Sequence, residues 1–196
     1  MEITSINQID VNKTYHYADY LLWKFKERVE LLRGKIFQMS PAPASSHQRI
    51  LRNINRELDK FFYHQRCELF FAPFDVILKD VKGEETTVVQ PDICVICDPE
   101  KLDEKGCHGA PDLVVEILSP GNSKKEMDGK FQIYEEVGVF EYWVVFPVEK
   151  CVLVYVLENG RYRGLKPFTE GQNIESEKFP NLQVPVSKIF QKVFFT

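Results

Sequence analysis

Two carboxylic side chains occur in sequence surroundings that otherwise suit the apolar interior of a β-sheet. Glu116 interrupts the run DLVVEIL at 112–118, and Asp92 interrupts the run VVQPDICVI at 88–96. A buried carboxylate without a partner is costly, so it takes up a proton or binds a cation. Mg²⁺ prefers one or two carboxylates together with water and the phosphate oxygens of a substrate. The two residues therefore indicate a divalent-metal site.

A lysine in the next predicted helix is the third charge at an unexpected position. On a helical wheel of residues 124–137, with about 100° per residue, Lys130 and Glu126 fall on the apolar arc. The opposite arc has ample room for charged residues, so the position of the lysine needs a reason. An ammonium facing the sheet would meet both carboxylates and a phosphate. Two interpretations follow from this pattern: a shared site of Asp92, Glu116 and Lys130, or charged residues that are separately paired or snorkelling.

Two more polar residues share the faces of these carboxylates. Side chains alternate along a strand, so Asp112 points to the same side as Glu116 and Gln90 to the same side as Asp92. We expect Asp112 and Gln90 to support the site.

The elements that carry these residues follow from apolar periodicity and turn signals. The predicted helices span about 14–24 (with Thr14 as N-cap), 45–66, 124–137 and 186–190. The predicted strands span 29–32, 35–39, 69–78, 88–96, 112–118, 141–146, 151–157 and 161–168, with a charged loop at 98–109. This order favours an α/β (α+β) fold with a mixed central sheet flanked by helices and an N-terminal extension of one helix and a β-hairpin.

Length and composition limit the class of protein. The chain has 196 residues, of which 44% are hydrophobic and 28% charged, so we expect a single domain over 1–196 with its core at about 45–158. A long apolar run and a signal-peptide pattern are both missing from the sequence, which favours a cytoplasmic protein without a membrane partner. The net charge of −4 disfavours an extended basic clamp for nucleic acid but permits a small contact area.

The five cysteines allow two interpretations. They stand at positions 67, 94, 97, 107 and 151 and are most simply free thiols in a reducing compartment. A zinc site made by Cys94, Cys97, Cys107 and His108 is the less favoured alternative. Residues 94 and 97 point to opposite faces of one strand, whereas structural zinc needs four converging ligands.

The segment GAPDLVVEILSP at 109–120 resembles the Uma2 family, which is placed in the PD-(D/E)XK nuclease superfamily. The resemblance extends over roughly 14–190, through 30–34, 39–41, His47, 91–92, Lys130, Tyr134, 138–139 and 141–145. It implies a restriction-endonuclease-like fold and an endonuclease that uses Mg²⁺ or Mn²⁺ to hydrolyse phosphodiester bonds of nucleic acid, with DNA expected. A homodimer is also expected, because cutting two strands usually takes two sites.

The resemblance assigns roles residue by residue. Asp92 matches the motif aspartate after proline, and Glu116 matches the acidic residue of the second half-motif. The superfamily lysine two residues later is replaced by Leu118, and Lys130 on the helix takes its place. The implied metal ligands are Asp92, Glu116 and the backbone carbonyl of Ile117, while Lys130 would orient water or stabilise developing charge.

Other matched positions have supporting roles. Glu30 or Glu126 would bind a second metal or hydrogen-bond the lysine. His47 would contact phosphate or tune the metal, unless it is a solvent-facing residue at the helix start. The family often has aspartate at the positions of Glu126, Arg33 and Phe146, and none of these departures removes an implied metal ligand.

A second function class uses the same fold. A catalytically inactive module that binds nucleic acid or another protein would keep the sheet and helices without turnover. The net acidity favours this alternative slightly, whereas the retained acidic residues and lysine favour an enzyme.

Overall fold

The structure is a computed structural model that describes residues 3–39, 44–119 and 124–194, with the backbone alone for 124–126. Its helices are η1 Ile6–Gln8, α1 Tyr17–Tyr20, α2 Ser45–Phe62, η2 Pro99–Lys101, α3 Lys124–Val137 and α4 Val186–Ile189. Its first strands are β1 Val29–Leu32, β2 Lys35–Gln38, β3 Glu68–Phe71, β4 Asp75–Leu78, β5 Thr87–Val89, β6 Ile93–Ile96 and β7 Leu102–Asp103. The later strands are β8 Gly106–His108, β9 Leu113–Ile117, β10 Glu141–Phe146, β11 Cys151–Glu158, β12 Arg161–Gly164, β13 Asn173–Glu175 and β14 Gln183–Pro185.

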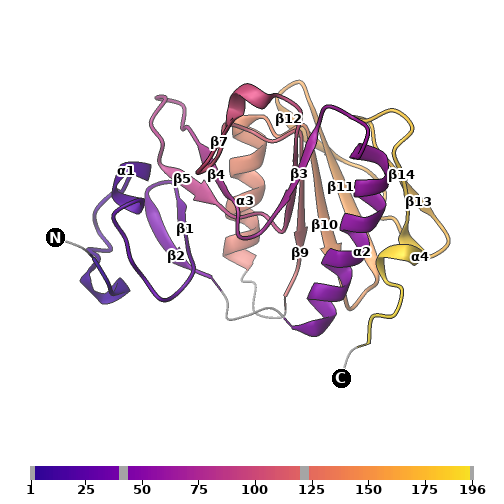
Figure 1. The fold of residues 1–196 in the computed structure, drawn as a ribbon, viewed down its shortest axis with the longest axis horizontal. Helices are drawn as coiled ribbons and strands as arrows, with labels where there is room; N and C mark the ends of the chain where they lie inside the picture. Colours follow the sequence, from indigo (N-terminus) through magenta and orange to yellow (C-terminus); the bar gives the residue numbers. More distant parts are fainter. Residues whose placement is uncertain (1–2, 40–43, 120–123, 195–196) are drawn as a thin grey trace.

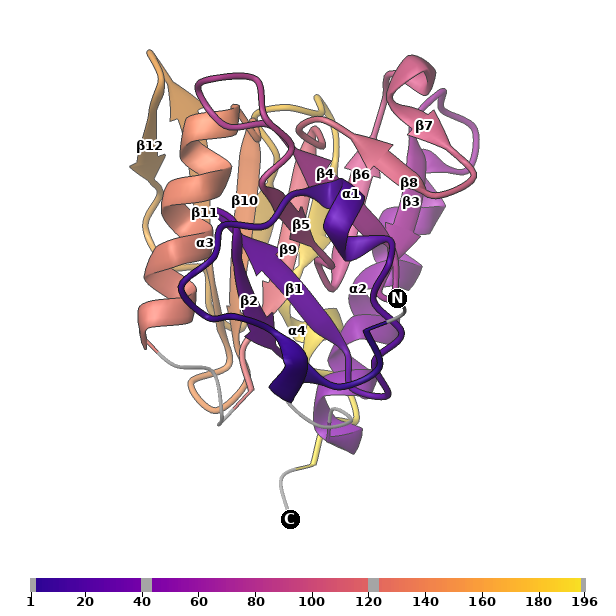
Figure 2. The ribbon, with the colours of Figure 1, turned by 90° about the vertical axis from the view of Figure 1, so that its left-hand side faces the viewer.

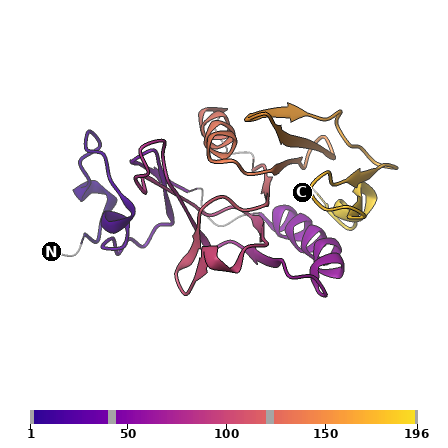
Figure 3. The same cartoon turned by 90° about the horizontal axis from the view of Figure 1, so that it is seen from above.

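The strands of the described ranges form two larger sheets and a small hairpin. The central sheet has the order β12-β11-β10-β9-β6-β3, and the N-terminal sheet has the order β2-β1-β5-β4-β8-β7. In Figure 1, α3 lies between these two sheets, whereas α2, the β13–β14 hairpin and α4 cover the other face of the central sheet. Figure 3 shows α2 and α3 on opposite sides of the central strands. The predicted mixed sheet flanked by helices is therefore confirmed.

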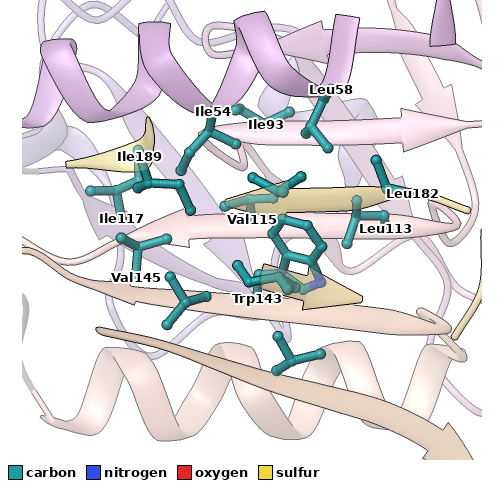
Figure 4. Packing of buried hydrophobic residues seen from close by; sticks show 14 of the residues in the cluster. Ile54, Leu58, Ile93, Leu113, Val115, Ile117, Trp143, Val145, Leu182 and Ile189 are labelled. Carbon is teal, nitrogen blue, oxygen red and sulfur yellow. The ribbon is translucent and has the colours of Figure 1, made fainter. Parts of the chain in front are cut away.

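The face of the central sheet towards α2 carries the main apolar core. Ile50, Ile54 and Leu58 recur at every fourth position of α2 and are fully buried. They pack against Val115 and Trp143 of the central strands (Figure 4). Burial of each such side chain contributes about 1.5–3 kcal/mol, which holds the long helix on the sheet. The helix begins as predicted but ends at residue 62 instead of 66.

A parallel crossover joins β9 to β10 through α3. The two strands pair in parallel, with Val115 opposite Trp143 and Glu116 opposite Val144. Gly138 ends the helix with a positive φ of 88°, a conformation that glycine adopts without strain. One continuous segment, β9 followed by α3, thus carries both Glu116 and Lys130. A crossover of this length packs its helix on the sheet.

The prediction of two continuous strands at 69–78 and 88–96 is wrong. Each segment passes from one sheet into the other, so β3 and β6 pair in the central sheet while β4 and β5 pair in the N-terminal sheet. Pro73 and Pro91 stand at the corner, where a residue without an N–H cannot continue the ladder. Four residues, 72–75, face three residues, 90–92, between the two paired regions, so the corner contains a bulge.

Other differences are smaller. The predicted first helix spans only Tyr17–Tyr20, because the N–H of Tyr15 pairs with the carbonyl of Gly34 and Thr14 is therefore not an N-cap. The predicted loop at 98–109 contains η2, β7 and β8, of which β8 pairs with β4. The strand predicted to reach residue 168 ends at Gly164, and the β13–β14 hairpin was not predicted.

The cysteines differ from the expected free thiols. Cys67 and Cys97, next to the paired ends of β3 and β6, form a disulfide, whereas Cys94 and Cys107 are buried thiols. The alternative zinc set is thus not formed, because Cys97 is bonded to another sulfur. In the part of the chain that the structure describes, no helix is long and apolar enough to cross a membrane.

Candidate active site

Lys130 is buried between two carboxylates that come from different sheets. Its Nζ atom lies 2.9 Å from Oε1 of Glu30 and 3.0 Å from Oε1 of Glu116. The exposed fractions of the side chains are 8% for Lys130, 1% for Glu30 and 13% for Glu116. Since β1 carries Glu30 and β9 carries Glu116, this ammonium joins the N-terminal sheet to the central sheet.

Glu30 is fixed from a second direction by the corner between the sheets. Its Oε1 also accepts a hydrogen bond of 2.8 Å from the backbone N–H of Gln90. β1 pairs with β5 through Leu31 and Val88, which places Glu30 next to this part of the corner. The carboxylate is thereby held by one backbone donor and one ammonium, so its position does not depend on Lys130 alone.

Tyr134 is a second donor to Glu116. Its hydroxyl donates a hydrogen bond of 2.8 Å to Oε1, the same oxygen that Lys130 contacts. The lysine and the tyrosine are four positions apart, so they lie on one face of α3. Both donors act on Oε1, and Oε2 of Glu116 receives no hydrogen bond from the side chains and backbone that the structure describes.

Asp92 stands at the corner, immediately before β6, and not inside a strand as predicted. Its Oδ2 accepts a hydrogen bond of 2.7 Å from the backbone N–H of Ile117 and lies 3.2 Å from Nε2 of His47. The bulge turns Asp92 towards the end of β9, where Ile117 follows Glu116. The corner and β9 thus bring the two predicted metal-binding carboxylates to one place.

His47 lies in the first turn of α2 and is buried, so its alternative as a solvent-facing residue is wrong. Burial alone would lower the pKa of His47, but the hydrogen bond and charge of Asp92 and a hydrogen bond with the backbone of Ile117 outweigh burial and raise it. The ring therefore connects α2 to the carboxylate of Asp92. Its Nδ1 has no hydrogen-bond partner among the described residues.

The charges of the site shift one another's pKa values. Burial raises the pKa of Glu116 to about 7; the charges of Asp92 and Glu30 also raise it, while Lys130 and the bond from Tyr134 lower it. For Lys130, burial would lower the pKa, but the two glutamates outweigh burial and raise it. The lysine therefore stays charged, and Glu116 is the group of this pair that titrates near neutral pH.

The donor set suits a hard divalent cation. The described residues contain no group of three or more His, Cys, Asp or Glu side chains placed to hold a metal ion. Asp92, Glu116 and the carbonyl of Ile117 are the residues that could hold Mg²⁺ or Mn²⁺, because such ions keep several waters and need few protein ligands. The carboxylates of Glu30, Asp92 and Glu116 and the ammonium of Lys130 together carry about two negative charges when all four groups are ionised. A divalent cation would balance these charges.

Two predicted supporting residues, Asp112 and Gln90, do not join this set through their side chains. Oδ2 of Asp112 accepts a bond from the backbone N–H of Cys97, and its Oδ1 pairs with Lys178 at 2.9 Å. Asp112 is thus a structural anchor about 13 Å along the strand from Glu116, at roughly 3.3 Å per residue. The side chain of Gln90 bonds Asp75 and Arg28 instead. The side chain of Glu126 lies outside the described part of the structure.

Comparison with known families decides the affiliation of the chain. The Uma2 family model, described as "Putative restriction endonuclease", matches residues 17–187. The chain belongs to the Uma2 family. The matched range includes Glu30, His47, Asp92, Glu116 and Lys130.

Two relatives define how far this likeness extends. A crystal structure of "a putative nuclease belonging to DUF820" from Anabaena variabilis matches with a TM-score of 0.72 and 21% identity, over 92% of this chain and 99% of that one. An uncharacterized protein from Synechocystis sp. is 28% identical over 118 residues, which are 59% of this chain and 60% of that protein. The matched part is thus less than two thirds of the Synechocystis protein. Membership in the Uma2 family supports a nuclease-type hydrolase, and the structural likeness agrees with the predicted restriction-endonuclease-like fold.

Tyr134 was not predicted as a functional residue of this Uma2 site. The helical wheel placed it on the apolar arc beside Lys130, and a buried tyrosine needs a partner for its hydroxyl. That requirement was the available signal, because the closest polar residue on the facing strand is Glu116.

Proposed function

We propose that this protein is a metal-dependent endonuclease that hydrolyses phosphodiester bonds of DNA with Mg²⁺ or Mn²⁺. The proposal rests on Asp92, which accepts the backbone N–H of Ile117, and on the preceding residue Glu116, which pairs with the buried Lys130. A site built only for stability would gain little from such a group of buried charges, because their desolvation offsets their attraction. Family membership supplies the reaction class.

Each side chain has a separate task in this proposal. Asp92, Glu116 and the carbonyl of Ile117 would hold the metal ion, which supplies a water of lowered pKa and polarises the phosphoryl group. Lys130 orients Glu116 and opposes the rise in its pKa that burial causes. The charge of Lys130 is already balanced by two carboxylates, so a role as a freely mobile phosphate ligand is disfavoured.

The experiment combines metal titration with matched carboxylate variants. Protein purified without chelator is incubated with plasmid, duplex, single-stranded DNA and RNA while Mg²⁺ or Mn²⁺ is varied. We expect metal-dependent cleavage that is lost in Asp92→Asn and Glu116→Gln. Asp112→Asn is the control, because it removes a carboxylate of the same strand that serves the Lys178 anchor.

Two results would contradict the proposal. One is the lack of cleavage of every substrate by folded protein at saturating metal. The other is equal cleavage by the wild type and the two site variants, which would identify a contaminating nuclease. Binding of nucleic acid without cleavage would favour the inactive-module alternative, and sedimentation of the same samples tests the proposed homodimer.

A further inference from the structure

A cavity of about 600 Å³ opens between the β1–β2 hairpin and α3. Figure 2 shows the hairpin beside this helix. Leu32 and Ile133 form its floor and are almost completely buried. The walls come from Phe37 on the hairpin and Gly129 on the helix. The cavity is thus an open hollow with an apolar base.

The cavity adjoins the proposed catalytic site. Phe37 lies directly opposite Glu30 in the antiparallel hairpin, so the two side chains project from the same face. Gly129 precedes Lys130, and Ile133 lies one turn after it. Residues that line the cavity are thus direct neighbours of Glu30 and Lys130, and Lys130 also contacts Glu116.

Gly129 leaves the helix backbone bare at the cavity wall. Glycine in the interior of a helix is destabilising relative to alanine, so it needs a reason. Packing within the described residues does not supply one, because a Cβ atom added at Gly129 would have nothing within 4 Å. Glycine is the residue that allows a ligand to approach a backbone closely.

Phe37 offers an aromatic face to this space. Its side chain is half-buried, and it takes part in no ring–ring contact among the described residues. Phe131 on the same helix is different, because its ring packs against Tyr142, Tyr155 and Tyr162. Phe37 packs in part against the neighbouring hydrophobic cluster, and its remaining surface lines the cavity, where a base could contact it.

The rim of the cavity is polar. Asp128 and Gln132 are exposed one turn apart on α3 and provide hydrogen-bond acceptors and an amide donor. Arg33 adds a cation at the hairpin turn, in an exposed ion pair with Glu136 at 2.8 Å. The φ angle of Arg33 is 49°, a conformation in which glycine, asparagine or aspartate is usual. An arginine at this position is therefore conformationally unfavourable.

We propose that this cavity binds an unstacked base of single-stranded nucleic acid next to the cleaved phosphate. The base would stack on Phe37 and lie over Gly129, while Gln132 and Asp128 bond its polar edge. Arg33 would leave its surface pair to contact a backbone phosphate. A nucleotide combines a flat apolar face, a polar edge and an anion, and these match the floor, rim and turn of the cavity. The inference rests on the proposed function and specifies its substrate as an unpaired strand.

The test measures binding without cleavage. A fluorescently labelled single-stranded oligonucleotide is titrated with the protein in Ca²⁺, and the anisotropy gives Kd. Phe37→Ala and Gly129→Leu are expected to weaken binding about tenfold, because one stacked base is lost. Phe37→Trp should retain the wild-type Kd. Phe71→Ala is the matched control, since Phe71 is 52% exposed on β3 in the other sheet.

Thermal unfolding of each variant separates misfolding from lost contact, and Phe37→Leu repeats the test if Phe37→Ala is unstable. Equal Kd values for the wild type, Phe37→Ala and Gly129→Leu would overturn the inference, and so would tighter binding of duplex than of single strand. Cleavage that persists with unchanged Kd would leave the proposed nuclease standing and reject the base site. If the variants bind more weakly than the wild type but the wild type cuts no substrate, the base site stands and the proposed nuclease is rejected.

Discussion

Replacement of Tyr134 by phenylalanine removes one oxygen from the centre of the site. The wild-type hydroxyl donates to Oε1 of Glu116 at 2.8 Å, and Lys130 donates to the same atom at 3.0 Å. Together the two donors hold Oε1 of the carboxylate, and Oε2 would be the oxygen that the proposed metal ion uses. We therefore regard Tyr134 as a positioning residue and expect the substitution to loosen Glu116 without emptying the core.

The size of the effect follows from these contacts. A hydrogen bond to an ionised group contributes about 1.5–3 kcal/mol. Substitution of a residue that orients a metal ligand typically lowers metal affinity 10- to 100-fold. Because Lys130 remains as the second donor, we expect the lower end, about tenfold weaker Mn²⁺ binding. The pKa of Glu116 should also rise above its value of about 7, since burial raises it and the bond from Tyr134 opposes that rise.

The assay is calorimetric titration of Mn²⁺ into metal-free protein, with urea unfolding of the same samples. Tyr162→Phe is the matched control, because the hydroxyl of Tyr162 donates a 2.9 Å hydrogen bond to the carbonyl of Val139 and does not contact Glu116. The control variant should lose stability and keep the wild-type Mn²⁺ affinity. Unchanged Mn²⁺ affinity in Tyr134→Phe, or an equal loss in both variants, would refute the positioning role.

Three further predictions concern buried charges. Lys130→Met leaves Glu30 and Glu116 without their cation, and we expect a loss of about 3–5 kcal/mol in urea unfolding at pH 8; a loss as large at pH 5, where Glu116 holds a proton, would contradict it. In metal-free protein the pKa of Glu116 lies near 7 instead of 4.5, so the folded state holds a proton that the unfolded state has released. Stability should therefore fall as pH rises from about 4.5 to 7, by roughly 3 kcal/mol, and Glu116→Gln should flatten this slope in a pH series of urea unfolding. Glu141→Ala strands the indole N–H of Trp143, which lies 2.6 Å from Oε1, and the hydroxyl of Ser176, and should destabilise by about 3 kcal/mol without a change in Mn²⁺ affinity.

The sequence was sufficient where the site is local in the chain. Glu116 and Lys130 are separated by one crossover, and the apolar pattern on both sides of them fixes β9, α3 and β10. The helical wheel then decides that the lysine faces the sheet. Packing the apolar face of α3 on the sheet turns Lys130 towards β9, and the structure places it beside Glu116.

Contacts between distant segments were beyond such reasoning. Glu30 lies 100 positions before Lys130, and no periodicity shows that β1 packs beside α3. Pro73 and Pro91 were visible in the sequence, yet each stands in an apolar run that also reads as one strand. Whether the chain bends at these prolines depends on which sheet the second half of each segment joins. Tertiary packing decides this, and the local sequence does not show it.

Short elements were missed for another reason. β13 and β14 have three residues each, too few for alternation to be recognised. Their placement depends on Glu141, whose buried carboxylate accepts bonds from Ser176 and from the backbone N–H groups of Glu177 and Lys178. A single carboxylate thus fixes a hairpin that its own sequence barely specifies.

The bulged corner at 72–75 and 90–92 can tolerate a change of length in the β4–β5 arm. A one-residue insertion in an ordinary hairpin reverses every side chain beyond it, which would turn a catalytic carboxylate away from its partners. Here the corner already accommodates one unmatched residue. Insertions in the β4–β5 arm can therefore be absorbed before they reach β6, and Asp92 keeps its bond to Ile117. The β4–β5 arm can thus vary in length, while β1 keeps Glu30 beside Lys130 and the corner keeps Asp92 beside Ile117.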